Sequence, residues 1–298
     1  MALEEFGIVV YQGRDYETCR ERALVLRAVG IDCRLDFVEG FHRVSVTADE
    51  AQRAHRELDA YELEAHAPPP QVVRDIPARP GAGLGIAGFV ATLLIVAALQ
   101  TNTAFGIDWL GLGRMQAGLV LQGDWWRTVT ALTLHADLGH LLGNLLMGSA
   151  IGFFAVRLLG LGLGWTTIIA AGAAGNGINA WVQGASHNSI GASTAIFAGL
   201  GLVSVFGWTR RRHLRDWAQR TAPLVGGALL LAYTGTGGER TDIVAHLTGF
   251  LAGAAFGFLY ARLKTLEPLQ RGVPGMILAA AAALLVPLCW ILAVQAGR

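Results

Sequence analysis

The sequence predicts an all-α polytopic membrane protein that is preceded by a small α+β soluble domain. The first 80 residues contain 15 of the 22 acidic and 10 of the 23 basic residues, so the N-terminal part is acidic and the remainder is basic. Hydrophobic residues make up 53% of the chain and charged residues only 15%. Because a charge at the centre of a bilayer is costly, the long charge-free intervals after residue 80 are candidate membrane spans.

The soluble domain is expected at residues 1–65. Hydrophobic periodicity predicts a strand, a helix and two further strands, at residues 7–11, 15–29, 33–38 and 41–46. Thr47, with Glu50 three residues later, has the pattern of a capping box for a second helix that continues through Tyr61. The order β-α-β-β-α predicts a small open sandwich.

A linker is expected at residues 66–83. Five prolines occur in this stretch, and proline favours neither a helix interior nor a central strand. They are Pro68, Pro69, Pro70, Pro77 and Pro80. The boundary between the soluble and membrane parts is therefore predicted here.

Seven membrane spans are expected after the linker. Five charge-free intervals each suit one helix of about 20 apolar residues. They lie between residues 79 and 108, 137 and 157, 220 and 239, 242 and 262, and 271 and 298. The interval from 157 to 210 is too long for one helix, and the polar stretch at 183–189 divides it into two.

The basic residues predict the orientation of these spans. With a cytoplasmic N-terminal domain, most basic side chains fall in inside loops, and only Arg114, Arg127, Arg240 and Arg298 fall outside. The first six residues contain no apolar core, so no cleaved export signal is expected. We therefore expect a multi-pass protein of the cell membrane whose N-terminus is cytoplasmic.

Four polar residues are predicted to meet near the outer face. Ser193 begins the fourth span and His246 lies about one turn into the sixth, and both spans enter from outside. The second span also starts outside, with His140 and Asn144 one turn apart on one face. Their side chains should therefore lie at similar depth.

These residue types suit acyl transfer. A serine hydroxyl needs a base, and the imidazole of His246 is a suitable base near neutral pH. The amide of Asn144, a ring N–H of His140 and the backbone N–H of Ser193 are the kinds of donor that stabilise an oxyanion. No carboxylate lies in these spans, so a Ser-His dyad is expected. Phe197, one turn after Ser193, is placed to pack against the imidazole.

Small residues predict close packing around the dyad. Gly249, Gly253 and Gly257 share a helix face with His246 and would let the fourth span approach closely.

Four motifs together resemble those of rhomboid intramembrane serine proteases, in the same order and topology. They are Trp126-Arg127, His140-Leu141-Leu142-Gly143-Asn144, Gly191-Ala192-Ser193 and the run from His246 to Gly253. The resemblance covers about residues 84–264. It implies a six-helix domain in which Ser193 is the nucleophile, His246 the general base, and His140 with Asn144 the oxyanion hole.

Further expectations follow from the same resemblance. The loop with Trp126 and Arg127 would be structural, and His135 would correspond to a histidine often present in that loop. The fifth span, with its glycine-rich cap at residues 235–238, would gate substrate entry. Residues 272–296 would be the extra C-terminal helix of some family members, and the N-terminal domain resembles that of some bacterial members. Thr194 stands where the family commonly has glycine, and its branched side chain is expected to crowd the contact between spans four and six.

Each of these residues also has an ordinary structural interpretation. Ser193 alone would be a helix N-cap, His246 a hydrogen-bonding or proton-relay group, and Asn144 a cross-link between helices. His135 and His187 are expected to be loop or interfacial residues. Convergence at one depth favours catalysis over these separate interpretations.

The expected function is an intramembrane serine endopeptidase that cleaves transmembrane segments of membrane proteins from a site open to the outer face. The alternative is a catalytically silent rhomboid-like protein that binds or escorts membrane clients. Proton-coupled transport through His246 is disfavoured because the spans contain no acidic relay partner. The sequence contains no pattern for a metal, nucleotide or nucleic-acid site, so no cofactor is expected, and the bilayer and transmembrane substrates are the expected partners. Cys19, Cys33 and Cys289 are expected to be reduced.

Overall fold

The computed structural model describes residues 6–66, 79–211, 216–235 and 242–297. The chain divides into two compact units, Met1–Val72 and Val73–Arg298. Most of the predicted linker, residues 67–78, and positions 236–238 of the glycine-rich cap lie outside the described residues.

The N-terminal unit has the predicted α+β fold. β1 (Ile8–Gly13), β3 (Phe41–Val46) and β2 (Arg34–Val38) form an antiparallel sheet in the order β1-β3-β2. Helices α1 (Tyr16–Ala28) and α2 (Ala51–His66) complete the predicted order. Their apolar faces and the central strand enclose a small core that includes Cys19, Leu26, Val44 and Val46.

Local signals in the sequence determine where α1 begins and ends. For α2 they predict the start of the helix less accurately. Asp15 caps α1 by accepting a hydrogen bond from the Thr18 N–H at 2.8 Å, and Gly30 supplies a positive φ of 78° just after its end. α2 begins later than the Thr47 cap predicted. The Glu50 N–H instead donates to the Thr47 carbonyl at 3.2 Å, so a turn precedes the helix.

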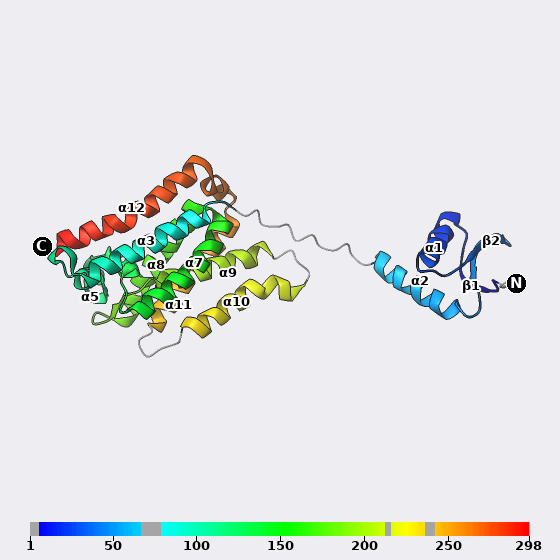
Figure 1. The fold of residues 1–298 in the computed structure, drawn as a ribbon, viewed down its shortest axis with the longest axis horizontal. Coiled ribbons are helices and arrows are strands. Elements are labelled where there is room, and N and C mark those ends of the chain that lie inside the picture. Colours follow the sequence, from blue (N-terminus) through cyan, green and yellow to red (C-terminus); the bar gives the residue numbers. More distant parts are fainter. Residues whose placement is uncertain (1–5, 67–78, 212–215, 236–241, 298) are drawn as a thin grey trace. The chain divides into compact units, whose positions relative to one another are not determined.

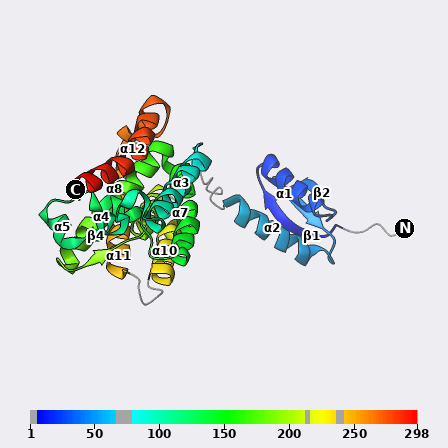
Figure 2. The ribbon, with the colours of Figure 1, turned by 60° about the vertical axis from the view of Figure 1, so that its left-hand side comes forward.

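Seven long helices form the second unit within the described residues (Figures 1 and 2). They are α3 (Ala82–Thr101), α7 (Leu138–Leu159), α8 (Leu161–Gln183), α9 (Ser193–Arg210), α10 (Trp217–Gly235), α11 (Ile243–Arg262) and α12 (Gly272–Ala296). The polar stretch at 183–189 divides α8 from α9, as predicted.

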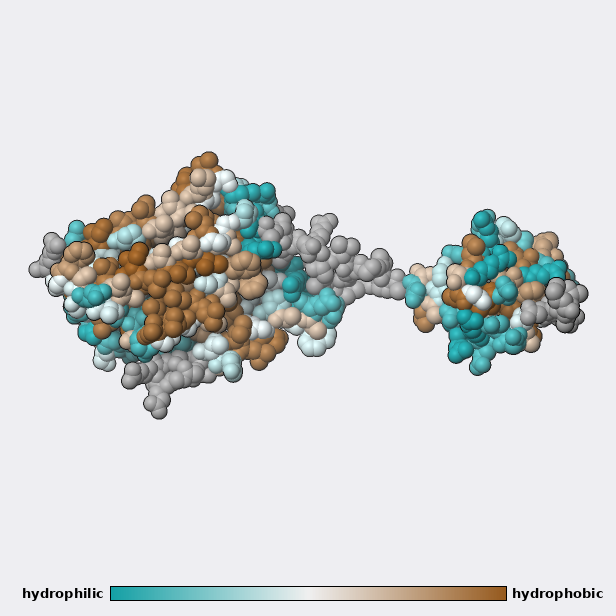
Figure 3. All heavy atoms as spheres, in the orientation of Figure 1, coloured by the Kyte–Doolittle hydropathy of each residue, from teal (hydrophilic) through white to brown (hydrophobic). Residues whose placement is uncertain are grey.

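The helical unit is built to cross a membrane several times. Four of its described helices, α3, α7, α11 and α12, are individually long and apolar enough to span a bilayer. Apolar residues cover much of the face of this unit shown in Figure 3. α9 is different because most of its residues are buried in the bundle, where it packs against α7, α8, α10 and α11. Its helical neighbours, rather than lipid, therefore surround most of α9.

Short elements connect α3 to α7. They are η1 (Ala104–Gly106), α4 (Trp109–Gly113), β4 (Met115–Gln116), α5 (Ala117–Gln122), α6 (Arg127–Thr130) and η2 (Ala131–Thr133). β4 pairs with β5 (Asn188–Ser189), and the Ala117 N–H donates to the His187 carbonyl at 2.9 Å. These bonds hold the segment that leads into α9.

α12 is anchored to the bundle at both ends. η3 (Lys264–Gln270) connects it to α11, and the helix then packs along α8 and α6. Near its end, the Trp290 indole is buried and donates to the Thr133 hydroxyl at 3.1 Å. In both ribbon views α12 and α10 lie on opposite sides of the bundle (Figures 1 and 2).

Glycines bring α9 and α11 into backbone contact. A Cβ added at Gly249 would overlap the Thr194 carbonyl, one at Gly253 would overlap the Ala198 carbonyl, and one at Gly201 would overlap the Phe250 carbonyl. Helices separated only by glycine and alanine gain many close dispersion contacts. This packing determines how near the first turns of α9 and α11 lie to one another.

Gly253→Ala should therefore destabilise the bundle. The new methyl cannot fit without separating α9 from α11, which should cost about 2 kcal/mol and lower the melting temperature in detergent micelles. Gly177→Ala on α8 is the matched control, because a Cβ there meets no atom within 4 Å. Equal melting temperatures for the two variants would contradict this packing argument.

Candidate active site

Ser193 and His246 meet at the first turns of α9 and α11. The Ser193 Oγ lies 2.9 Å from the His246 Nε2, which is hydrogen-bond distance. The N-cap of α9 is Ala192, so Ser193 is the first helical residue and is not the N-cap. Its hydroxyl is therefore directed to the imidazole and not to a capping role.

The segment before Ser193 requires glycine at position 191. Gly191 has a φ of 126°, which a residue with a side chain rarely adopts, and its N–H donates to the Ala131 carbonyl at 2.9 Å. A Cβ there would lie 2.8 Å from the Nε2 of His140 and 3.5 Å from the Ser193 Oγ. Glycine thus lets the His140 ring approach the serine.

Phe197 packs against the imidazole, as the sequence predicts from its position one turn after Ser193. The two ring centroids are 4.4 Å apart and the ring planes are inclined by 37°. His246 itself is only 7% exposed. The aromatic contact therefore restricts the orientation of a largely enclosed imidazole.

Asn144 and His140 lie on α7, on the same cavity wall as the dyad. Asp137 caps α7 by accepting the His140 N–H at 2.8 Å, which positions this first turn. Asn144 is 6% exposed, and its Nδ2 has no hydrogen-bond partner among the described residues. An unused buried donor costs free energy, so this amide is available for a negatively charged oxygen that enters the cavity.

A polar cavity of about 700 Å³ brings these groups together. Its lining comes from the starts of α7, α9 and α11, from the α8–α9 segment and from the end of α10. The residues are Ala136, Asp137, Gly139, His140, Gly143, Asn144, Met147, Asn188, Ser189, Ile190, Ser193, Ile196, Phe197, Thr234, Asp242 and His246. All four polar residues expected to converge are in this set. The described residues contain no group of three or more His, Cys, Asp or Glu placed to hold a metal ion.

Thr194 is accommodated by glycines on two sides. The side chain is buried, and its Cγ2 would lie 3.1 Å from a Cβ at either Gly175 or Gly249. The extra methyl therefore fills space that glycines on α8 and α11 leave open. The branched side chain was expected to crowd the contact between spans four and six, and the glycines at positions 175 and 249 provide the room that it needs.

Arg127 and Trp126 lie in the connection between α3 and α7. The Arg127 guanidinium binds the Asp124 carboxylate at 2.9 Å and the carbonyls of Gly111 and Arg114 at 3.1 and 3.3 Å. It is 8% exposed, so these bonds are shielded from water. Trp126 packs into the neighbouring cluster around Leu134 and Trp290. The contacts made by both side chains hold this connecting segment together.

His135 lies in the same region and does not reach the dyad. Both its ring nitrogens are buried and have no hydrogen-bond partner among the described residues, while Gln100 bonds its backbone. Burial, followed by the nearby His140, lowers the pKa of His135 to about 4. The ring is therefore neutral at pH 7 and fills space beside His140.

The structure also brings together three residues that sequence reasoning missed. Asp242 accepts from the Ala245 N–H at 3.0 Å, which caps α11, and its other oxygen lies 2.8 Å from the His187 Nε2 and 2.9 Å from the Asn179 Nδ2. This cluster connects α8, the segment before Ser193 and the helix of His246. The sequence signal was an aspartate four residues before His246, but its partners are too distant in sequence to be assigned from spacing.

Hydrogen bonds dominate the charge state of Asp242. Burial raises its pKa, but the bonds from Ala245, His187, Ser189 and Asn179 together hold the pKa below its ordinary value. A carboxyl whose pKa is depressed in the folded state adds stability above the unfolded pKa of about 3.9, and loses it as the pH falls through the folded pKa.

Asp242→Ala should lower the melting temperature at pH 7. The variant loses the cap and leaves the buried Asn179 amide and the partly exposed His187 ring without their acceptor, a loss of about 2 kcal/mol. The difference from wild type should begin to shrink below about pH 4, near the unfolded pKa, and should be lost as the pH falls through the lower pKa of the folded state. Melting curves of wild type, Asp242→Ala and Asp242→Asn from pH 3 to pH 8 measure this, and a difference independent of pH would contradict it.

Comparisons with known proteins identify relatives over about half of the chain. A family model described as "Rhomboid domain" matches residues 122–263. "Rhomboid-like protease 1" of Toxoplasma gondii is 33% identical over 149 residues, which cover 48% of this chain and 49% of that protein. "Rhomboid protease GluP" of Bacillus subtilis is 31% identical over 150 residues, or 50% of this chain and 29% of that protein.

A shorter relative is matched over most of its length. "Putative rhomboid protease YdcA" of Bacillus subtilis is 31% identical over 151 residues, or 49% of this chain and 72% of that protein. The chain spans about half or less of the other two relatives.

Proposed function

Because the chain belongs to the rhomboid family, a family of membrane proteins that includes proteases, we propose that it is an intramembrane serine endopeptidase. The observation that carries the proposal is the 2.9 Å contact between the Ser193 Oγ and the His246 Nε2 on the wall of the polar cavity. A hydroxyl and an imidazole at this distance have the geometry that a nucleophile and its base require, and this supports the proposal.

The proposed reaction follows serine-protease chemistry with two catalytic side chains. His246 Nε2 accepts the hydroxyl proton as the Ser193 Oγ forms a bond to the scissile carbonyl carbon. The resulting imidazolium then donates that proton to the leaving nitrogen as the C–N bond breaks. A water molecule, deprotonated by the same imidazole, hydrolyses the acyl-enzyme and returns Ser193 to its starting state.

Three donors are proposed to stabilise the tetrahedral oxyanion. The Asn144 amide has an unused N–H, His140 lies beside Gly191, and the Ser193 backbone N–H belongs to the first turn of α9. First-turn N–H groups of a helix lack intrahelical acceptors and carry its positive dipole end. Asn144 and His246 are 6% and 7% exposed, and a donor that is held in place at a buried position contributes a large share of the rate.

The proposed substrates are transmembrane segments of other membrane proteins. A helical segment hides its carbonyls in internal hydrogen bonds, so the cut should occur where small or polar residues let the helix unwind. α10 is proposed to gate the lateral entry. Its Thr234 lines the polar cavity, and it packs on α9 through Pro223 against Gly207 and through Gly227 against Ser204.

The proposed topology has a cytoplasmic N-terminus and a polar cavity open to the outer face. The proposed domains are residues 1–65, a linker at 66–83, a six-helix protease domain at 84–264 and an added helix at 272–296. The basic residues in the inside loops support this orientation. The cavity then receives water from the outer side.

Ser193→Ala and His246→Ala should each abolish cleavage of a model transmembrane substrate. Loss of either group should reduce kcat by about 10³-fold or more, because the two act as a unit. Gel-based cleavage in proteoliposomes measures this, with Ser149→Ala as a control serine on α7 that does not line the polar cavity. Cleavage that persists in either dyad variant contradicts the proposal. If the wild-type protein folds but cleaves no member of a panel of transmembrane substrates, the result favours the alternative of a catalytically silent protein that binds membrane clients.

Single-cysteine labelling tests the topology. A membrane-impermeant maleimide should modify Ser186→Cys, in the exposed α8–α9 segment, on intact cells. Arg211→Cys, at the other end of α9, should react only after permeabilisation. The native Cys19, Cys33 and Cys289 are buried, so labelling of the wild-type protein measures the background reaction of these thiols. The reverse labelling pattern would contradict the cytoplasmic placement of the N-terminus.

A further inference from the structure

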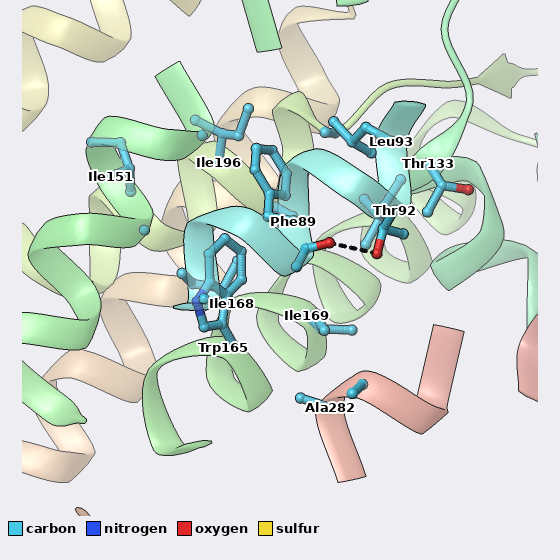
Figure 4. A pocket seen from close by; sticks show the side chains of 18 of the residues that line it. Phe89, Thr92, Leu93, Thr133, Ile151, Trp165, Ile168, Ile169, Ile196 and Ala282 are labelled. Carbon is cyan, nitrogen blue, oxygen red and sulfur yellow. Dashed lines mark hydrogen bonds between the residues drawn. The ribbon is translucent and has the colours of Figure 1, made fainter. Parts of the chain in front are cut away.

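An apolar cleft of about 390 Å³ lies on a neighbouring face of α9 from the polar cavity, and Ile196 lines both. α3, α8 and α12 form most of its walls, and Figure 4 shows Phe89 and Leu93 on α3, Ile168 and Ile169 on α8, and Ala282 on α12 around it. α3 and α12 do not pack along one another, so the cleft opens between them. In a chain that crosses a membrane, this opening faces lipid.

The cleft runs along the bundle from the starts of α3, α8 and α12 towards the dyad. The three starts adjoin, because a Cβ at Gly81 would lie 3.3 Å from Leu161 and one at Gly162 would overlap the Gly275 carbonyl. From Leu84 to Leu93 the α3 wall covers roughly 14 Å of helix rise. At the far end, Ala192 and Ala195 line the cleft directly beside Ser193.

The lining suits a hydrocarbon and does not suit water. The Trp165 indole N–H is its one buried side-chain donor without a partner among the described residues, and its hydroxyls are already used: Thr92 donates to the Gly88 carbonyl at 2.8 Å, and Thr133 donates to the Thr130 carbonyl at 2.7 Å and accepts from Trp290. Trp165 stacks on Phe89 with centroids 5.3 Å apart, which adds aromatic surface. Water enters a cavity when polar partners are available, whereas an apolar space of this size is stabilised by an apolar occupant.

Positive charge surrounds the end of the cleft where α3 and α12 begin. The Arg79 side chain bonds Gln270 in η3, next to the start of α12, and its Nε is buried without a partner among the described residues. Within the described part of the chain, Arg271 and Arg210 lie close enough to act on its charge, and Glu267 is the acid that acts on it. Three guanidinium groups against one carboxylate leave a net positive site for an anion. Basic pockets between membrane helices on the cytoplasmic side bind anionic lipid headgroups.

We propose that this cleft binds one anionic phospholipid, with an acyl chain between α3, α8 and α12 and its phosphate at Arg79 and Arg271. The chain occupies the apolar lining, and the two arginines select the headgroup. Because the cleft ends at Ala192 and Ala195, the lipid supports the face of α9 that adjoins the face lining the polar cavity. The site does not depend on the proposed proteolytic activity.

Native mass spectrometry tests this on the purified full-length protein in mild detergent. The protein is titrated with phosphatidylglycerol or phosphatidylcholine of identical acyl chains. We expect the first phosphatidylglycerol to bind about tenfold more tightly than the first phosphatidylcholine. The double variant Arg79→Gln/Arg271→Gln should bind the two lipids with equal affinity.

Filling the cleft provides the second arm. A Cβ at Gly88 meets no atom within 4 Å, so position 88 has room for the start of a side chain, and Gly88→Leu should weaken phosphatidylglycerol binding about tenfold by occupying the cleft. Gly83→Leu is the matched control, because it is also open and lies on α3 outside the lining. Ala283→Leu fills the cleft from α12. It therefore tests whether weaker binding in Gly88→Leu reflects only a local disturbance of α3.

Each outcome decides the proposal. Weaker binding in Gly88→Leu and Ala283→Leu, with wild-type binding in Gly83→Leu, supports it. Wild-type affinity in both filled variants, or equal affinity of the wild type for the two lipids, overturns it.

Discussion

The approach of α9 to α11 is the constraint on which the rest of the structure depends. Gly249 and Gly253 let the α11 backbone touch carbonyls of α9, and Gly201 does the same from the other helix. With the backbones this close, the Ser193 Oγ and the His246 Nε2 come within 2.9 Å without any long side chain between them. The same closeness explains why α9 is buried among helices, although it is less apolar than the four helices that would span a bilayer by themselves.

The polar groups at this end of the bundle divide into two kinds. The Asp242 carboxylate accepts from Asn179 and lies within hydrogen-bond distance of His187, and these contacts hold the starts of α9 and α11 in place. The Asn144 Nδ2 has no partner among the described residues, and an unpaired buried donor is costly. An unused donor on the cavity wall is a group that can bind a ligand with developing negative charge.

Much of this arrangement can be predicted from simple features of the sequence. The remainder depends on contacts between segments that are distant in sequence, and only the three-dimensional structure reveals them. Charge-free intervals predicted the long helices because charge is excluded from the bilayer core, and a common entry side placed Ser193, His246, His140 and Asn144 at one depth. The partners of Asp242 come from two other segments, so residue spacing carries no signal for them. The fit of Thr194 against Gly175 was equally hidden, because it depends on helix rotation and not on pattern.

Covalent labelling by a fluorophosphonate tests the central claim most directly, since the reagent reports an activated serine without requiring a known substrate. Peptide mass spectrometry of the labelled protein in micelles should locate one adduct, on Ser193. Adduct formation should be lost in a folded His246→Ala variant, because the hydroxyl then has no base. A folded wild type that remains unlabelled, or Ser193 labelling that proceeds equally well without His246, would contradict the account.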